Sequence, residues 1–253
     1  MSNYKVVIPN LAGREDRFNL CMGHLLAQGV PPEHIRRFFA HDGKHYTDAK
    51  HITNYVVADL ELRHRYGNGR YLTTQWDGWD VYSYAWMWTW YEIVDEIARE
   101  PDELPPTLVL IDDWAMDIEF SVIKDHVSIL SKMEMPFCML QYVHSTSESN
   151  EKQSKRDNKR TIIPTIQHGI AGTGDPAMLI TPLGARRLID YADKHPQHCP
   201  EMLMWYFSRN GDNSGCYSAI ENMSHNITEG AYNLFQDRAE TTEGKHIVYE
   251  ENQ

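Results

Sequence analysis

Short apolar runs alternate along the chain with stretches in which apolar residues recur at helical spacing. The runs typical of strands are residues 5–9, 36–40, 107–111, 136–143 and 177–180, and the helical stretches are residues 15–28, 82–100 and 120–130 and the segment that begins at Pro182. Strands that alternate with helices favour βαβ units with right-handed crossovers. We therefore predict an α/β fold in which a mixed, mostly parallel sheet is flanked by helices.

Other stretches break this pattern. Residues 44–74 are polar and rich in His and Tyr, and residues 165–173 form a turn-rich segment around His168-Gly169. Residues 145–160 contain no large apolar residue, so they cannot contribute to a core, and we expect a loop there, either a lid or plain disorder. Because neither a repeat nor a linker interrupts the chain, we expect a single domain.

The stretch Thr107–Asp117 carries the strongest chemical signal. A buried strand ends there in two adjacent carboxylates, Asp112 and Asp113. Ligands of open α/β sheets bind outside the carboxyl ends of the strands, and carboxylate oxygens suit a hard divalent cation. Asp is also a favoured residue at a helix N-cap, so this stretch alone supports a metal site and a helix cap equally.

Composition narrows the classes of partner. The formal net charge of −12 disfavours non-specific binding to nucleic acid or to anionic membranes. No run approaches the roughly 18 apolar residues of a membrane span, and the first residues lack the layout of a signal peptide. The four cysteines are scattered and no H-E-x-x-H spacing occurs. We therefore expect a soluble, cytoplasmic protein with no transmembrane segment, no disulfide framework and no thiol-rich metal site.

Several motifs, in order, resemble those of the glycosyltransferases of the lipooligosaccharide-biosynthesis and procollagen galactosyltransferase family, which have a GT-A fold. Residues 10–17 resemble its N-L-x-x-R-x-D-R motif, residues 40–43 its A-x-D-G turn, residues 78–90 its helix before the metal strand, residues 110–113 its L-E-D-D motif, and residues 177–188 its A-Y-L-I-S-x-x-G-A-R-K-L motif. Together the motifs extend from the start of the chain to about Ile189.

The resemblance implies a GT-A-like, Rossmann-type glycosyltransferase domain over residues 1–253. A nucleotide-sugar-binding half would cover residues 1–143, a flexible loop residues 144–160, and the acceptor half and tail residues 161–253. The implied enzyme transfers a hexose or pentose from a nucleotide-diphosphate donor, expected to be a UDP-sugar, to a hydroxyl of a saccharide or glycan acceptor. Mn²⁺ or Mg²⁺ would neutralise the departing diphosphate.

The resemblance also implies the metal ligands. Asp113 matches the last acid of the family motif and Asp112 the middle one, whereas Ile111 replaces the first acid. Asp117 or a backbone carbonyl is a candidate substitute for that missing acid. The family often uses a late histidine as a further ligand, and His225 is our candidate for it.

The remaining site residues concern the donor and the acceptor. Arg14 and Arg17 lie one helical turn apart at a helix start, where both can face a phosphate; the alternative is that they are solvated surface arginines. Asn10 and Asp42 would lie at the ends of neighbouring strands and contact the base or ribose, although Asp42 could simply make the turn before Gly43.

An inverting transfer needs a base for the acceptor hydroxyl. Asp175 and Glu201 are the candidates for this base, and the alternative for each is an ordinary surface acid.

Three further functions stay open at this point. One is transfer of sugar to a hydroxylated base in DNA, as in a viral enzyme, with a basic cluster of Lys152, Lys155, Arg156, Lys159 and Arg160 meeting the backbone. Another is a non-catalytic nucleotide-sugar or glycan-binding module, which the loss of an acid at Ile111 makes conceivable. The last is a phosphoesterase with two ions held by Asp112, Asp113 and Asp117.

Overall fold

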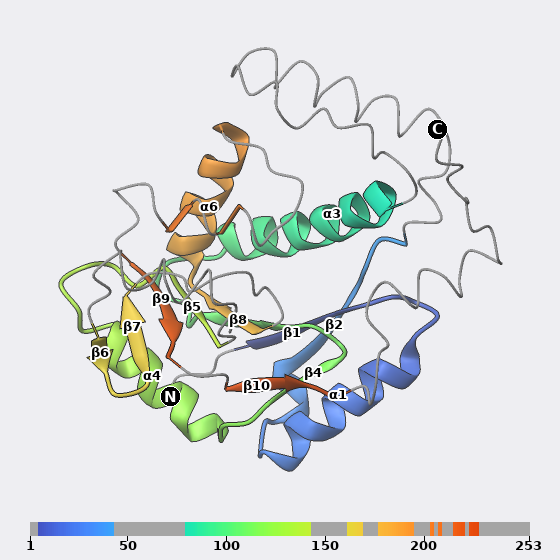
Figure 1. Cartoon of the computed structure of the whole chain (residues 1–253), viewed down its shortest axis with the longest axis horizontal. Helices are drawn as coiled ribbons and strands as arrows, with labels where there is room; N and C mark the ends of the chain where they lie inside the picture. The colour runs from blue at the N-terminus through green and yellow to red at the C-terminus, as the bar shows by residue number, and fades with distance from the viewer. Residues whose placement is uncertain are drawn as a thin grey trace, which may run out of the picture.

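The computed structural model describes residues 5–42, 79–142, 161–168, 177–194, 203–204, 207–208, 215–220 and 223–227 (Figure 1). Within these residues an eight-stranded sheet forms the centre of the molecule. In spatial order its strands are β2 (Ile35–Phe39), β1 (Lys5–Asn10), β3 (Thr107–Leu110), β8 (Ala177–Ile180), β5 (Met139–Gln141), β9 (Cys216–Ala219), β7 (Ile166–His168) and β6 (Thr161–Ile163).

The sheet is mixed, and most of its strands share one direction. Strands β1, β2 and β3 pair in parallel, and β5 and β9 do the same. Strand β8 is antiparallel to both β3 and β5, and β7 is antiparallel to both β9 and β6. Only β8 and β7 therefore run against the other described strands of this sheet, which confirms the predicted mixed, mostly parallel arrangement.

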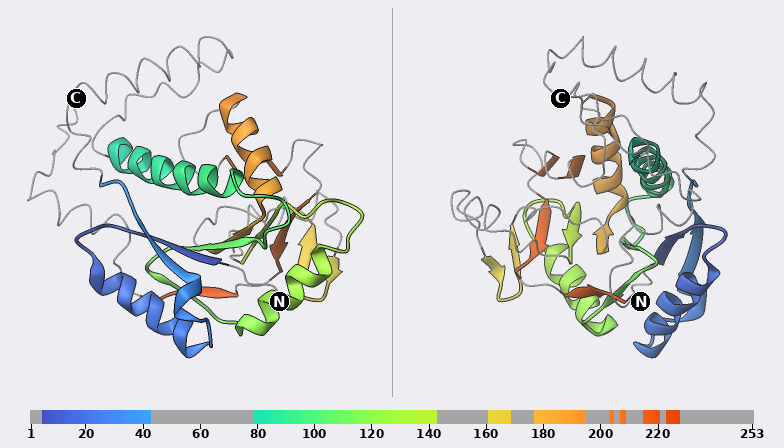
Figure 2. Two further views of the ribbon diagram at one scale, coloured as in Figure 1. Left: turned by 180° about the vertical axis from the view of Figure 1, so that it is seen from behind. Right: turned by 45° about the vertical axis from the view of Figure 1, so that its right-hand side comes forward.

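Helices cover both faces of the sheet (Figures 1 and 2). Helices α1 (Glu15–Ala27) and α4 (Phe120–Leu130) lie on one face, and α3 (Trp79–Ala98) and α6 (Pro182–Lys194) lie on the other. A short 3-10 turn, η1 (Pro32–His34), leads into β2. Strands β4 (Trp114–Met116) and β10 (Ser224–Asn226) form a second, antiparallel sheet beside the first. The α/β fold with flanking helices is the predicted one.

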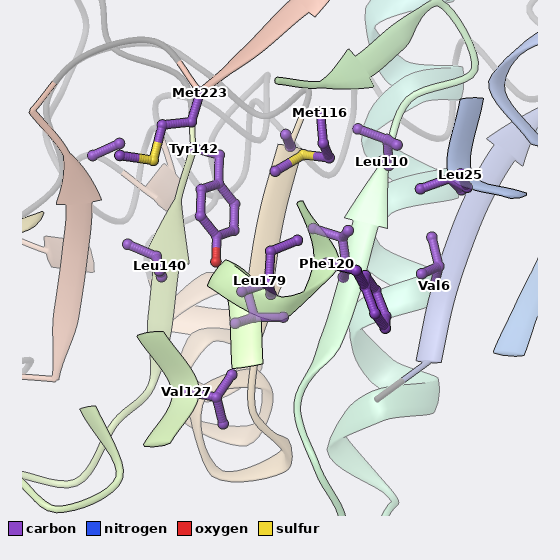
Figure 3. Close-up of a cluster of buried hydrophobic side chains, with 14 of the residues drawn as sticks. Val6, Leu25, Leu110, Met116, Phe120, Val127, Leu140, Tyr142, Leu179 and Met223 are labelled. Carbon is purple, nitrogen blue, oxygen red and sulfur yellow. The ribbon is translucent and has the colours of Figure 1, made fainter. Parts of the chain in front are cut away.

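The apolar runs form strands because both of their faces are buried. Val6 and Ile8 pack on the side of α1 and α4, whereas Val7 between them packs on the side of α3 and α6. Figure 3 shows part of the hydrophobic core on the side of α1 and α4, in which Leu25 and Phe120 lie near strands β1 and β3. The stripe of tryptophan and isoleucine along α3 is core as well, as the helical spacing predicts, with Trp90 fully buried.

The structure corrects the sequence-based boundaries at several places. Residues 161–168, of which the second half was predicted to be turn-rich, form the β6–β7 hairpin. Strands β4, β9 and β10 were not predicted, since these short strands are defined by pairing with distant segments. The predicted strand over 136–143 is only Met139–Gln141. No helix among the described residues is both long and apolar enough to cross a bilayer.

Residues of the G-A-R motif join helices α3 and α6. The Arg186 guanidinium donates to the carbonyls of Ala98 at 2.9 Å and Glu100 at 3.0 Å and pairs with the carboxylate of Asp102. Carbonyls at the end of a helix have no partner within the helix, so Arg186 caps the end of α3. Gly184 is required for close packing, because a Cβ there would overlap the backbone carbonyl of Cys138. These two motif residues are therefore structural.

We expect Arg186→Ala to lower the free energy of unfolding by about 1–2 kcal/mol, because it removes charge-assisted hydrogen bonds from carbonyls at a helix end. Urea denaturation of the full chain measures this change. The control Arg186→Lys keeps the charge but not the planar fork and should recover only part of the loss. An unchanged midpoint in Arg186→Ala would show that the cap does not stabilise the fold.

Candidate functional site

The ends of strands β1 and β3 bring Asn10 and Asp112 together. The two strands are parallel neighbours, so their carboxyl ends lie at the same edge of the sheet. The Asn10 amide Nδ2 donates to Asp112 Oδ2 at 2.5 Å and to the carbonyl of Arg14 at 2.7 Å. The other amide atom, Asn10 Oδ1, is buried and accepts no hydrogen bond within the described residues. An unsatisfied buried acceptor favours a ligand that donates to it or coordinates it.

Burial dominates the electrostatics of Asp112. Loss of solvent raises the pKa of Asp112 to about 6, while the Asn10 hydrogen bond opposes this shift. The neighbouring charge of Asp113 raises the pKa of Asp112 further, and Arg17 and Arg14 lower it. Asp113, Arg17 and Arg14 therefore all act electrostatically on Asp112 at this edge. Their predicted roles in holding a metal or a donor phosphate stay predictions.

Asp113 is held in a turn that leads into β4. Its side chain is buried, with 4% of the residue exposed. The turn is closed by a hydrogen bond of 3.0 Å from Trp114 N–H to the Ile111 carbonyl, and Ile227 N–H donates to the Asp113 carbonyl at 2.8 Å. Since a strand follows, the interpretation of these acids as a helix cap is wrong. The next helix, α4, has Glu119 at its N-cap.

Ile111 replaces the first acid of the family motif, and the structure shows an apolar environment for it. The residue is 6% exposed and belongs to the buried hydrophobic residues. A carboxylate at this position would be poorly solvated. Any ion at this edge would therefore depend on the two acids that follow Ile111.

The two arginines lie at the start of α1 in different environments. Arg17 is only 5% exposed, so the alternative of a solvated surface arginine is wrong for it. Arg14 is the N-cap residue of α1. Its Nε and Nη2 bind the two carboxylate oxygens of Asp16 at 3.2 and 3.1 Å, and this hydrogen bonding lowers the pKa of Asp16. Positive charge and the helix N-terminus thus converge beside Asp112.

Helix α3 anchors the segment that follows β2. Ala40 N–H donates to the Asn10 carbonyl at 3.0 Å, and His41 N–H donates to Thr89 Oγ1 at 2.9 Å. The His41 ring Nε2 lies 2.9 Å from Glu92 Oε2. Asp42, the predicted base or ribose contact, follows directly and is half-buried. The anchoring role of Thr89 was missed from sequence, because it lies within a helical stripe that reads as core.

The structure places His225 against Asp117. Strand β10 pairs with β4 so that His225 lies opposite Ala115, and His225 Nδ1 is 2.6 Å from Asp117 Oδ1. A hydrogen bond at Nδ1 leaves Nε2 as the nitrogen through which this ring would bind an ion. The role of His225 as a metal ligand stays a prediction. Asp117, the candidate substitute for the missing acid of the motif, contacts His225.

The oxygen atoms at this edge suit a cation whose coordination shell is completed by the substrate. Within the described part of the chain, no group of three or more His, Cys, Asp or Glu side chains is arranged to hold a metal. Asp112, Asp113 and the unsatisfied Asn10 Oδ1 are oxygen donors at one edge. Mg²⁺ is commonly held by one or two carboxylates together with substrate phosphates. These residues therefore fit a divalent ion that binds together with a diphosphate.

Other predicted residues lie outside the described residues. They are the candidate bases Asp175 and Glu201 and the basic cluster between Lys152 and Arg160. Their roles stay predictions, as does the division of the chain into two halves and a loop.

Comparisons with known proteins add one structural likeness. No family model matches the chain, and no curated protein matches it in sequence. Among solved structures, the apo form of mouse xyloside xylosyltransferase 1 is similar, with a TM-score of 0.40 and 11% identity over 81% of this chain and 80% of that chain.

Proposed function

We propose that the chain is a GT-A-type glycosyltransferase that moves a sugar from a nucleotide-diphosphate donor to a hydroxyl of a saccharide or glycan. The observation that carries this proposal is the pair Asp112–Asp113 at the carboxyl edge of the sheet, where Asp112 accepts a hydrogen bond from Asn10 and lies near Arg14 and Arg17. Such an edge is where ligands of open α/β sheets bind. The mixture of acids and arginines suits a diphosphate bound with a cation.

Each group has a distinct role in this proposal. Arg17 and the N-terminus of α1 would bind the diphosphate, whose negative charge increases as the sugar leaves. Asp113 and Asp112 would hold Mn²⁺ or Mg²⁺, which supplies Lewis-acid neutralisation of that charge when it is bound. Asn10 would orient Asp112 by its hydrogen bond of 2.5 Å, and Asp42 would contact the ribose or base.

The acceptor side of the proposal rests on the sequence. If the reaction inverts the sugar, Asp175 or Glu201 would take the proton from the acceptor hydroxyl. A saccharide or glycan acceptor is proposed in preference to DNA because the chain carries a net charge of −12.

Ligand-induced stabilisation of the full chain tests the proposed function. We expect nucleoside diphosphates and their sugars, UDP-sugars above all, to raise the melting temperature in the presence of Mn²⁺ and less so without it, because a ligand that binds only the folded state stabilises it by mass action. Release of UDP from a stabilising UDP-sugar then shows turnover. If no nucleotide shifts the melting temperature at millimolar concentration, the proposal is wrong.

A second candidate, a non-catalytic nucleotide-sugar-binding module, is favoured by one observation. Ile111 is buried and apolar where the family motif has an acid, so one oxygen donor of that motif is missing. Stabilisation by a nucleotide sugar without UDP release, across a panel of saccharide acceptors, would support the binding module over the enzyme.

A further inference from the structure

A large aromatic side chain is exposed beside the proposed donor site. Phe39 is the last residue of β2 and is 65% exposed, more than any other large apolar residue in the described part of the chain. Single exposed apolar residues are common on protein surfaces. Phe39, however, lies at the same edge of the sheet as the proposed donor site.

Strand register places Phe39 next to Asn10. The two residues are paired across the parallel strands β1 and β2, so Phe39 also lies at the carboxyl edge. Side chains alternate along a strand. Ile35 packs on the side of α1 and Phe38 on the side of α3, so Phe39 lies on the α1 side. Val6 and Ile8 place Asn10 on that side too.

The distance across the edge matches the extended shape of a nucleotide. Asp112 follows β3, Asn10 ends β1 and Phe39 ends β2, and these three strands are consecutive in the sheet. Two strand spacings amount to about 10 Å. A ribose with its base can bridge that span from a diphosphate held beside Asp112. The ring of Phe39 therefore lies at the far end of such a ligand.

Arg37 fixes the ring of Phe39 from behind. Its guanidinium carbon lies 4.8 Å from the centroid of the Phe39 ring and 5.2 Å from that of Phe18 on α1. The same guanidinium donates through Nη2 to the carbonyl of Leu11 at 3.1 Å. Arg37 precedes Phe39 by two residues on the same strand and covers one face of its ring. The 65% exposure of Phe39 leaves much of the rest of the ring open to solvent.

We propose that Phe39 is the platform on which the nucleobase of the donor stacks, an inference that rests on the proposed function. The ring is large and flat, Arg37 holds it in place, and it is exposed on the same side of the sheet as Asn10. Every base has a π-face, so such a platform contributes affinity for a nucleoside without choosing between bases. The base would be chosen by polar contacts from residues 40–42.

Binding of UDP, GDP, ADP and CDP, and of inorganic pyrophosphate, to the full chain with Mn²⁺ tests this inference by calorimetry. We expect Phe39→Ala to weaken the tightest nucleoside diphosphate about tenfold, which is the loss of one base–aromatic stack. The affinity for pyrophosphate should not change. Phe39→Leu keeps apolar area but no π-face and should also lose affinity, whereas Phe39→Trp should retain it. Leu20→Ala, at a residue of α1 that is 44% exposed, is the matched control.

The outcomes separate this inference from the proposed function. Unchanged nucleotide affinity in Phe39→Ala overturns the platform and leaves the proposed function standing. Equal loss of nucleotide and pyrophosphate affinity also overturns it, because the ring would then act on the diphosphate site through the loop that Arg37 contacts. A parent chain that binds neither probe overturns the proposed function itself, and the platform with it.

Discussion

Replacing Asp113 by asparagine is expected to lower Mn²⁺-dependent release of UDP from a UDP-sugar about a hundredfold or more. Asp113 is a buried residue in the turn between β3 and β4, where the proposed cation and diphosphate meet. A cation that neutralises a departing diphosphate supplies several kcal/mol of transition-state stabilisation, and each 1.36 kcal/mol is a factor of ten in rate. Losing one of the two proposed carboxylate ligands should remove much of this transition-state stabilisation.

The fold of this variant should have nearly the stability of the parent, because asparagine has nearly the shape of aspartate. Denaturant unfolding checks this, and calorimetric titration with Mn²⁺ should show affinity at least tenfold weaker than in the parent. The matched control is Asp190→Asn, at an exposed position on α6, which should change neither value. Parental Mn²⁺ affinity in Asp113→Asn would contradict the assignment of Asp113 as a ligand.

The sequence predicts the central elements well because their apolar runs are buried on both faces. Val6, Val7 and Ile8 alternate between two cores, and such a run reads as a strand whatever surrounds it. Strands β9 and β10 have four and three residues, and pairing with distant partners determines them. Local periodicity cannot show such pairing.

The site was predictable where chemistry and topology coincide in the sequence. Asp112 follows the buried strand β3, so its place at the carboxyl edge follows from the parallel pairing of β1 and β3. The hydrogen bond from Asn10 to Asp112 joins residues far apart in sequence, and only the strand register reveals it. The hydrogen bond from His41 N–H to the Thr89 hydroxyl and the contact between His225 and Asp117 also join distant residues, and only the packing of the folded chain reveals them.

The unusual protonation of Asp112 makes the stability of the ion-free protein depend on pH. Burial raises the pKa of Asp112 from 3.8 to about 6, so between these values the folded state binds more protons than the unfolded state. The stability contributed by this group is therefore present below about pH 4, falls as the pH rises to about 6, and then stays constant. A shift of this size corresponds to a loss of up to roughly 3 kcal/mol. His126 acts in the opposite sense, because burial lowers the pKa of its imidazole and stability then rises with pH near 6.5.

Asp112→Asn isolates the contribution of Asp112, since the variant keeps His126. We expect the free energy of unfolding of Asp112→Asn, relative to the parent, to increase by up to roughly 3 kcal/mol between pH 4 and pH 6.5 and to stay level above that. Urea denaturation at a series of pH values, in buffer with a chelator, measures the difference. With saturating Mn²⁺, the stability of the parent should rise with pH instead of falling, because a bound cation favours the charged carboxylate and stabilises the folded state. The pH dependence of Asp112→Asn should not change sign. A difference that does not change with pH would mean that Asp112 is solvated, and the buried edge that joins it to Asn10 would then be wrong.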